Sequence, residues 1–160
     1  MYHFLVWLEG SALGHAMRHG VWTYGLVNLA HILGVAALFG SVLALDLRLL
    51  GLWRTVSLPS IAGPTVPIAF TGFVVAALSG LGLLATKATE YWGNPFMLIK
   101  FPAIAVGVIN VAVLTSRPAW KAMGTRDLTR RERFELRAAG AVSLVAWTAA
   151  ISAGRMIGYW

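Results

Sequence analysis

The sequence predicts an all-α integral membrane protein, a bundle of four transmembrane helices preceded by a short amphipathic helix on the outer side. Three observations predict this fold class. Hydrophobic residues make up 58% of the 160-residue chain and charged residues only 12%, and the mean hydropathy is +0.73. Soluble domains carry about 25% charge, so a chain this apolar needs lipid around it. Several apolar stretches also reach the roughly 20 residues that cross a bilayer.

The first element is residues 1–20, which are too short and too polar to span the membrane. They either lie along the outer surface as an amphipathic helix or fold over the mouth of the bundle. The four spans follow, and the whole chain, 1–160, is expected to form one membrane domain. The spans are expected at residues 21–45, 66–86, 96–116 and 138–159.

The distribution of basic residues predicts the orientation. Seven of the thirteen lysines and arginines lie in residues 117–137, between the third and fourth spans. Such a loop is typical of the cytoplasmic side, which places both termini on the periplasmic side of a bacterial inner membrane. The loop includes a capping-box pattern from Thr129 to Glu132, so a helix is expected to begin there and continue into the fourth span. No separate basic domain exists, which argues against nucleic-acid binding.

Small residues recur every four positions on two of the spans. Helices in lipid associate through close backbone approach, so these stripes predict helix-packing faces. They are Gly72, Ala76 and Gly80 on the second span and Ala146, Ala150, Gly154 and Gly158 on the fourth. The chain contains no cysteine, which excludes disulfides, thiolate metal sites and iron–sulfur clusters.

A few polar side chains lie at depth in the membrane, where they are costly and must face the bundle interior or a polar cavity. His31 lies about 22 Å from the cytoplasmic end of its helix, and Arg155 lies at a matching depth. Asn28 shares the face of His31, and Lys100 lies near the outer end of the third span. These four residues predict an outward-facing pocket for an anion, a quinone head group or haem propionates. The alternatives are that His31 is an interhelical strut and that Arg155 and Lys100 extend to the interface.

A second pattern, HAMRH, places His15 and His19 one helical turn apart. Two imidazoles at this spacing can hold one metal ion. If the N-terminal segment folds over the bundle, either of them could approach His31 and complete a site for copper, zinc or haem iron. The alternative is the polar face of a surface helix.

Three stretches resemble an uncharacterised family of small bacterial inner-membrane proteins, and the resemblance runs from about Val21 to Trp160. They are AHILGVAALFGSVLALDLRLLG, NPFMLIK and SAGRMIGYW. This resemblance implies membrane location and a helical bundle, but no chemistry.

The chain is more distantly similar to the four-helix b-type cytochromes, the cytochrome b561 and superoxide oxidase group. Those proteins hold two haems with paired histidines. Here only His31 lies in a span, so one haem at most is expected, with His15, His19 or Met156 as the other ligand.

The favoured function is therefore redox-linked binding of one b-type haem or a quinone, with His31, Asn28, Arg155 and Lys100 in the site. One alternative is an accessory or scaffolding subunit of a larger membrane complex. The expected partners are the lipid bilayer and either further copies of the chain, in a homo-oligomer, or the other subunits of such a complex. The second alternative is a transporter or metal-handling protein that uses His15, His19 and His31 to hold copper or zinc.

Overall fold

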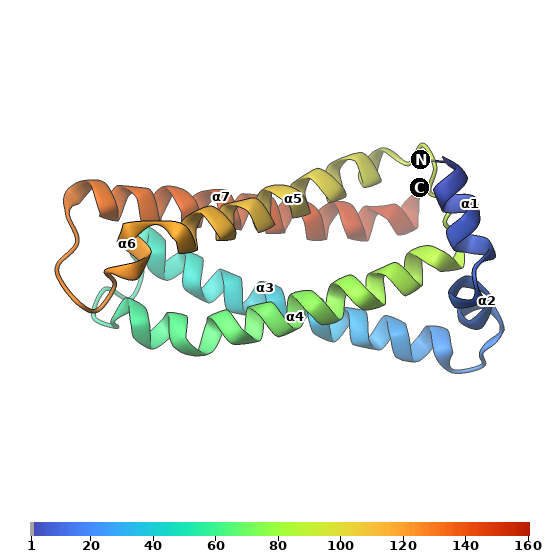
Figure 1. The fold of residues 1–160 in the computed structure, drawn as a ribbon, viewed down its shortest axis with the longest axis horizontal. Helices are drawn as coiled ribbons and strands as arrows, with labels where there is room; N and C mark the ends of the chain where they lie inside the picture. The colour runs from blue at the N-terminus through green and yellow to red at the C-terminus, as the bar shows by residue number, and fades with distance from the viewer. Residues whose placement is uncertain (1) are drawn as a thin grey trace. The chain divides into compact units, whose positions relative to one another are not determined.

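The structure is a computed structural model that describes residues 2–160, and every regular element in that range is helical (Figure 1). Four helices are long and apolar enough to span a membrane, which confirms the all-α fold class and is compatible with a multi-pass membrane protein. In chain order the helices are α1 (Tyr2–Gly10), α2 (Ala12–His19), α3 (Thr23–Leu50), α4 (Leu58–Thr86), α5 (Pro95–Ser116), α6 (Pro118–Lys121), α7 (Arg130–Met156) and the 3-10 turn η1 (Ile157–Tyr159).

Two spans are longer than the sequence predicts. α3 continues through the charged stretch to Leu50, and α4 begins at Leu58 and contains Pro64 and Pro67. Charged residues and prolines mark where an apolar stretch ends, and the helix can continue beyond that point. Near Pro64, the hydroxyl of Thr65 donates to the carbonyl of Ile61 one turn earlier in the same helix, at 2.7 Å.

The predicted start of α7 is confirmed. The side chain of Thr129 accepts a hydrogen bond from the backbone of Glu132, and the carboxylate of Glu132 accepts one from the backbone of Thr129. This reciprocal pair is a capping box, which satisfies two of the N–H groups that have no partner inside the helix.

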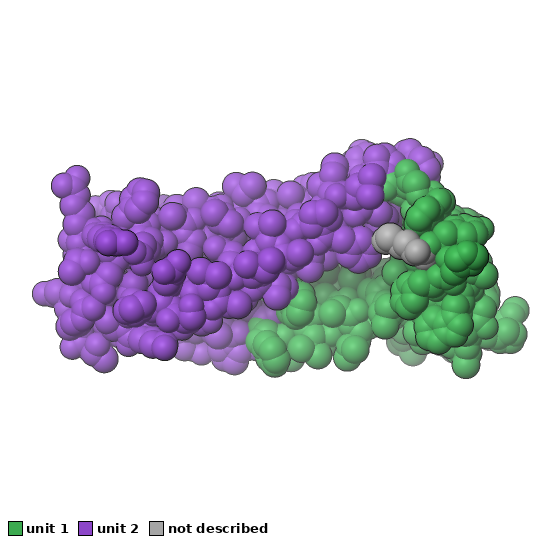
Figure 2. Space-filling view, turned by 45° about the horizontal axis from the view of Figure 1, so that its top comes forward, with its two compact units in different colours: residues 1–38, 70–94 green, residues 39–69, 95–160 purple. Residues whose placement is uncertain are grey.

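The chain divides into two compact units, which are coloured separately in Figure 2. Unit 1 comprises Met1–Leu38 and Phe70–Asn94, and unit 2 comprises Phe39–Ala69 and Pro95–Trp160. Unit 1 therefore holds α1, α2, the first part of α3 and the last part of α4. Unit 2 holds the remainder of α3 and α4 together with α5, α6 and α7. That the chain forms a single domain stays a prediction.

In unit 1, α3 and α4 cross with their backbones in contact. A Cβ atom on Gly72 would lie 2.6 Å from the backbone nitrogen of Leu38, and one on Gly34 would lie 2.7 Å from that of Ala76. Side chains cannot fit at such distances, so glycine is required on both helices. This contact confirms the packing face predicted from the small residues at 72 and 76.

The N-terminal segment forms two helices instead of one and packs on the C-terminal end of α4, within unit 1 (Figure 1). The break falls at Ser11, whose hydroxyl accepts a hydrogen bond from Gly14 and caps α2. Arg18 donates to the carbonyls of Ala85 and Thr86, which belong to the last turn of α4. These carbonyls have no partner inside the helix, so Arg18 caps α4 from another part of the chain.

In unit 2, α5 and α7 run side by side (Figure 1). The indole of Trp147 lies against Gly107 of α5, where an added Cβ would meet the ring at 2.8 Å. The amide of Asn110 donates to the carbonyl of Ala139 at 3.0 Å. A core of apolar side chains forms where α3 and α5 end and α7 begins. It comprises Leu49, Leu114, Ala119 and Leu136, one each from α3, α5, α6 and α7.

Candidate functional site

The central residue of the predicted site is His31, which lies on α3 in unit 1 and is fixed to α4. Its Nδ1 atom is 2.9 Å from the carbonyl oxygen of Ala76 and 3.1 Å from the hydroxyl of Ser79. The ring lies against Gly80, where an added Cβ would be 3.0 Å from its Cε1 atom. The third member of the small-residue stripe therefore makes room for the imidazole.

These contacts define which ring nitrogen carries a proton. A carbonyl oxygen can only accept, so the short contact with Ala76 requires Nδ1–H to donate. Ser79 is consistent with this assignment, because its own hydroxyl donates to the carbonyl of Val75 at 2.5 Å and its oxygen is therefore an acceptor toward Nδ1. In a neutral imidazole with Nδ1 protonated, Nε2 carries the basic lone pair.

Asn28 lies three residues before His31 on the same helix and in the same unit. It is partly buried, as His31 is. Residues three apart on a helix share one face, so the amide and the imidazole lie on the same side of α3. Both residues lie on α3 as the sequence predicts, and their joint role in a site stays a prediction.

The two cationic members, Lys100 and Arg155, lie in unit 2. The side chain of Lys100 runs along Gly154 of α7, where an added Cβ would lie 3.6 Å from its Cε and Nζ atoms. Arg155 is exposed, its guanidinium lies 4.7 Å from the ring centroid of Tyr159, and it donates to the hydroxyl of that tyrosine. Lys100 therefore lies beside the C-terminal end of α7, the end that carries Arg155. The grouping of all four residues into one pocket stays a prediction.

The predicted histidine pair lies side by side on α2. The ring centroids of His15 and His19 are 4.1 Å apart, and both residues are exposed. Within residues 2–160 the structure contains no group of three or more His, Cys, Asp or Glu side chains that could hold a metal ion. A structural zinc site needs four ligands, so the pair by itself supplies half of one.

Asp46 is a buried polar residue that the sequence interpretation missed. It lies on α3 in unit 2 with 3% of its surface exposed. The side chain of Ser143 on α7 forms a hydrogen bond with one carboxyl oxygen. The other, Oδ2, is buried and has no hydrogen-bond partner among the residues that the structure describes. Ser143 lies on the same face of α7 as Gly140 and Trp147, and all three are buried. The spacing of Gly140 and Ser143 was the sequence signal that this face of α7 packs closely against another helix.

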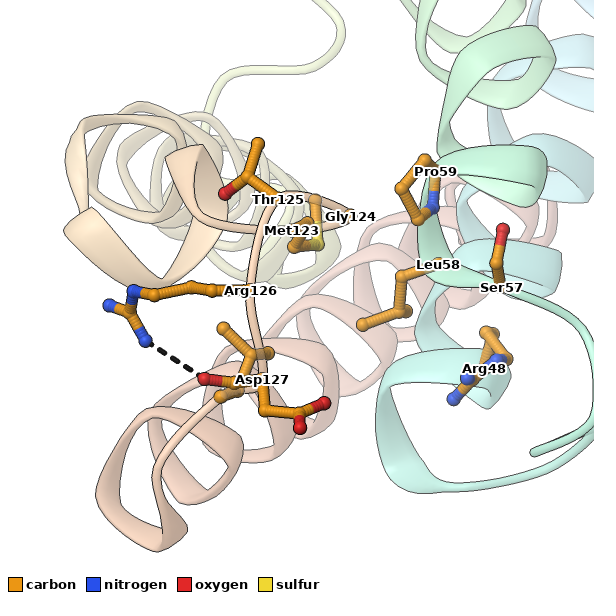
Figure 3. A pocket seen from close by; sticks show the side chains of 10 residues that line it. Arg48, Ser57, Leu58, Pro59, Met123, Gly124, Thr125, Arg126 and Asp127 are labelled. Carbon is orange, nitrogen blue, oxygen red and sulfur yellow. Dashed lines mark hydrogen bonds between the residues drawn. The ribbon is translucent and has the colours of Figure 1, made fainter.

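Unit 2 also has an open surface cavity of about 520 Å³ beside the 123–128 segment (Figure 3). Arg48 and Arg126 line it, but both donate to protein oxygens. Arg48 donates to the carbonyl of Val56 at 2.7 Å, and Arg126 donates to the carbonyl of Asp127 and forms an ion pair with Glu132. Arg48 therefore holds the segment after α3, and Arg126 holds the segment before α7. We assign no ligand to the cavity.

Comparison with known proteins adds no relative to this description, because no family model, curated protein or solved structure matches the chain. The functional argument therefore rests on the geometry of the site.

Proposed function

We propose that unit 1 binds one redox-active ligand at His31, either a b-type haem or a quinone head group. The single observation that carries this proposal is the hydrogen bond from Nδ1–H of His31 to the carbonyl of Ala76. Histidines that bind metal ions through Nε2 usually donate the other ring N–H to a backbone carbonyl or carboxylate, which fixes the ring orientation and the tautomer. The same orientation suits a hydrogen bond to a quinone.

The surroundings of His31 support an apolar ligand more than a hydrated ion. His31 lies within α3, a helix that is long and apolar enough to span a membrane. A porphyrin or a quinone ring fits an apolar environment that contains a few polar groups. For a haem, His31 would be one axial ligand; for a quinone, it would be the partner of a carbonyl oxygen, with Asn28 beside it.

For the whole chain we propose a small bacterial inner-membrane protein with both termini on the periplasmic side. The support is the basic segment 117–137, because lysine and arginine are enriched in cytoplasmic loops. The absence of cysteine from the sequence makes the test direct. Single cysteines introduced at Thr125 and at Glu90, both of which are exposed, should react from opposite sides of the membrane, with position 90 accessible to a thiol reagent that cannot cross it. Labelling of both from the same side would contradict the orientation.

The function is tested by an absorption spectrum of the purified protein, followed by titration with haem and with a quinone. Either a Soret band or saturable quinone binding is expected, and His31→Ala should abolish it. His3→Ala is the matched control, because His3 is an exposed histidine on α1 that lies outside the site. A protein that binds neither ligand, or binding that His31→Ala leaves unchanged, would contradict the proposal.

A further inference from the structure

Asp46 in unit 2 is a buried carboxyl that the proposed function does not use. It lies one turn before the end of α3 at Leu50. Gly140 of α7 lets that helix approach closely, since an added Cβ there would lie 3.3 Å from the carbonyl oxygen of Asp46 and 3.0 Å from the side chain of Leu49. This close approach leaves Asp46 only 3% exposed.

Among residues 2–160, no cation forms an ion pair with this carboxyl. Charged side chains of both signs occur on α3 and on the elements packed around this end of it, namely Arg48, Arg117, Lys121, Arg130, Arg131, Glu132, Arg133, Glu135 and Arg137. In the part of the chain that the structure describes, none of the ion pairs involves Asp46. Arg48 donates instead to Val56 and Arg133 to Leu128, whereas Arg137 is exposed.

An ionised carboxylate in this position would be unfavourable. A buried charge is tolerated when it is paired and hydrogen-bonded, but here one oxygen has the hydroxyl of Ser143 and Oδ2 has no partner. A neutral carboxylic acid fits the same contacts. Its O–H on Oδ1 donates to the oxygen of Ser143, and Oδ2 becomes a carbonyl oxygen. A carbonyl oxygen without a partner is less costly than an uncompensated charge.

We propose that Asp46 and Ser143 form a proton-binding site in unit 2. The carboxylate takes up one proton to become the carboxylic acid, and it returns to the carboxylate when it releases that proton. Buried carboxyls on membrane-spanning helices mark proton and ion pathways. This site is independent of the ligand at His31, and each can fail without the other.

The test is infrared spectroscopy of the full-length protein, made by cell-free synthesis with aspartate labelled with carbon-13 at the side-chain carboxyl. The chain has two aspartates, Asp46 and Asp127. Asp127 is exposed, and the variant Asp127→Asn removes its signal. We expect an isotope-shifted C=O band of a carboxylic acid at neutral pH in the Asp127→Asn protein, and its conversion to carboxylate bands at alkaline pH.

Two variants check the assignment. Asp46→Asn should remove the acid band, and Ser143→Ala should move it to higher frequency because the carboxyl loses a hydrogen bond. The Asp127→Asn protein retains Asp46, so the experiment does not depend on the folding of the Asp46 variant. Carboxylate bands alone from Asp46 at neutral pH would overturn the proposal, and an unmoved band in Ser143→Ala would overturn the role of Ser143.

Discussion

The α3–α4 crossing in unit 1 holds His31 against Ala76, and Gly72→Ala tests it. A Cβ atom at position 72 would lie 2.6 Å from the backbone nitrogen of Leu38 and 2.7 Å from the carbonyl oxygen of Gly34. Ordinary contact begins at 3.4 Å, so the helices must separate by 3.4 − 2.6 = 0.8 Å. Backbone atoms cannot rotate away, and a gap of that size loses a large part of the packing energy along the contact.

Overpacking of this kind costs about 1–3 kcal/mol in the free energy of unfolding. The matched control is Gly63→Ala on the same helix, where an added Cβ meets nothing within 4 Å. This control should gain about 0.5–1 kcal/mol, because alanine favours the helix. The two variants should therefore differ by roughly 1.5–4 kcal/mol, or on the order of 3–16 °C in Tm.

The assay is thermal unfolding in a mild detergent, followed by circular dichroism, with the two variants measured side by side. Gly72→Ala should melt below the wild type and Gly63→Ala at or above it. Equal melting temperatures for the two variants would refute the backbone contact between α3 and α4.

Three further perturbations follow from individual contacts. Ser79→Ala removes one acceptor from Nδ1 of His31 and keeps the carbonyl of Ala76, so ligand affinity should fall about tenfold or less, as a titration would measure; an unchanged affinity would mean that Ser79 does not help to orient the ring. Glu9→Gln tests the contact between α1 and Thr89, which lies in the turn after α4. Hydrogen bonds from the backbone and side chain of Thr89 lower the pKa of Glu9 from its usual 4.5, so the stabilisation is complete above pH 4.5 and is lost as the pH falls through the lowered value. The wild type should therefore be more stable than Glu9→Gln at neutral pH, by about 1 kcal/mol after screening, and the difference should vanish in acid; a difference that persists in acid would exclude the ionised carboxylate as its source. Thr129→Ala removes the cap of α7 and should cost about 1 kcal/mol in chemical denaturation, whereas a neutral result would show that Glu132 alone fixes this helix start.

Much of the fold could be predicted from the sequence, because long apolar helices and small-residue stripes leave a strong periodic signal. The stripe on the second span is confirmed by close contacts, and on the fourth span Ala146 and Ala150 are buried. At Gly158 an added Cβ would meet nothing within 4 Å. A stripe predicts a possible packing face, and its end near a helix terminus has no neighbouring helix to meet.

The site could be predicted only in part. His31 stands out as the single histidine in a span, but its main partner is a backbone carbonyl, and a carbonyl leaves no trace in the sequence. The first span is predicted to end at residue 45, directly before Asp46, because a charged residue usually marks the membrane edge. Asp46 is buried because Gly140 lets α7 approach, and such a contact between distant segments depends on tertiary packing.

The central claim is that His31 is held to α4 through Nδ1 and binds a ligand through Nε2, and nitrogen-15 NMR of histidine-labelled protein tests it most directly. The resonances of His31 are identified by their loss in His31→Ala. We expect Nδ1 to be protonated and Nε2 to carry the lone pair in the ligand-free protein, and the Nε2 resonance to shift when haem or quinone is added. A ligand-free His31 protonated at Nε2 alone, or an Nε2 resonance that neither ligand moves, would contradict the claim.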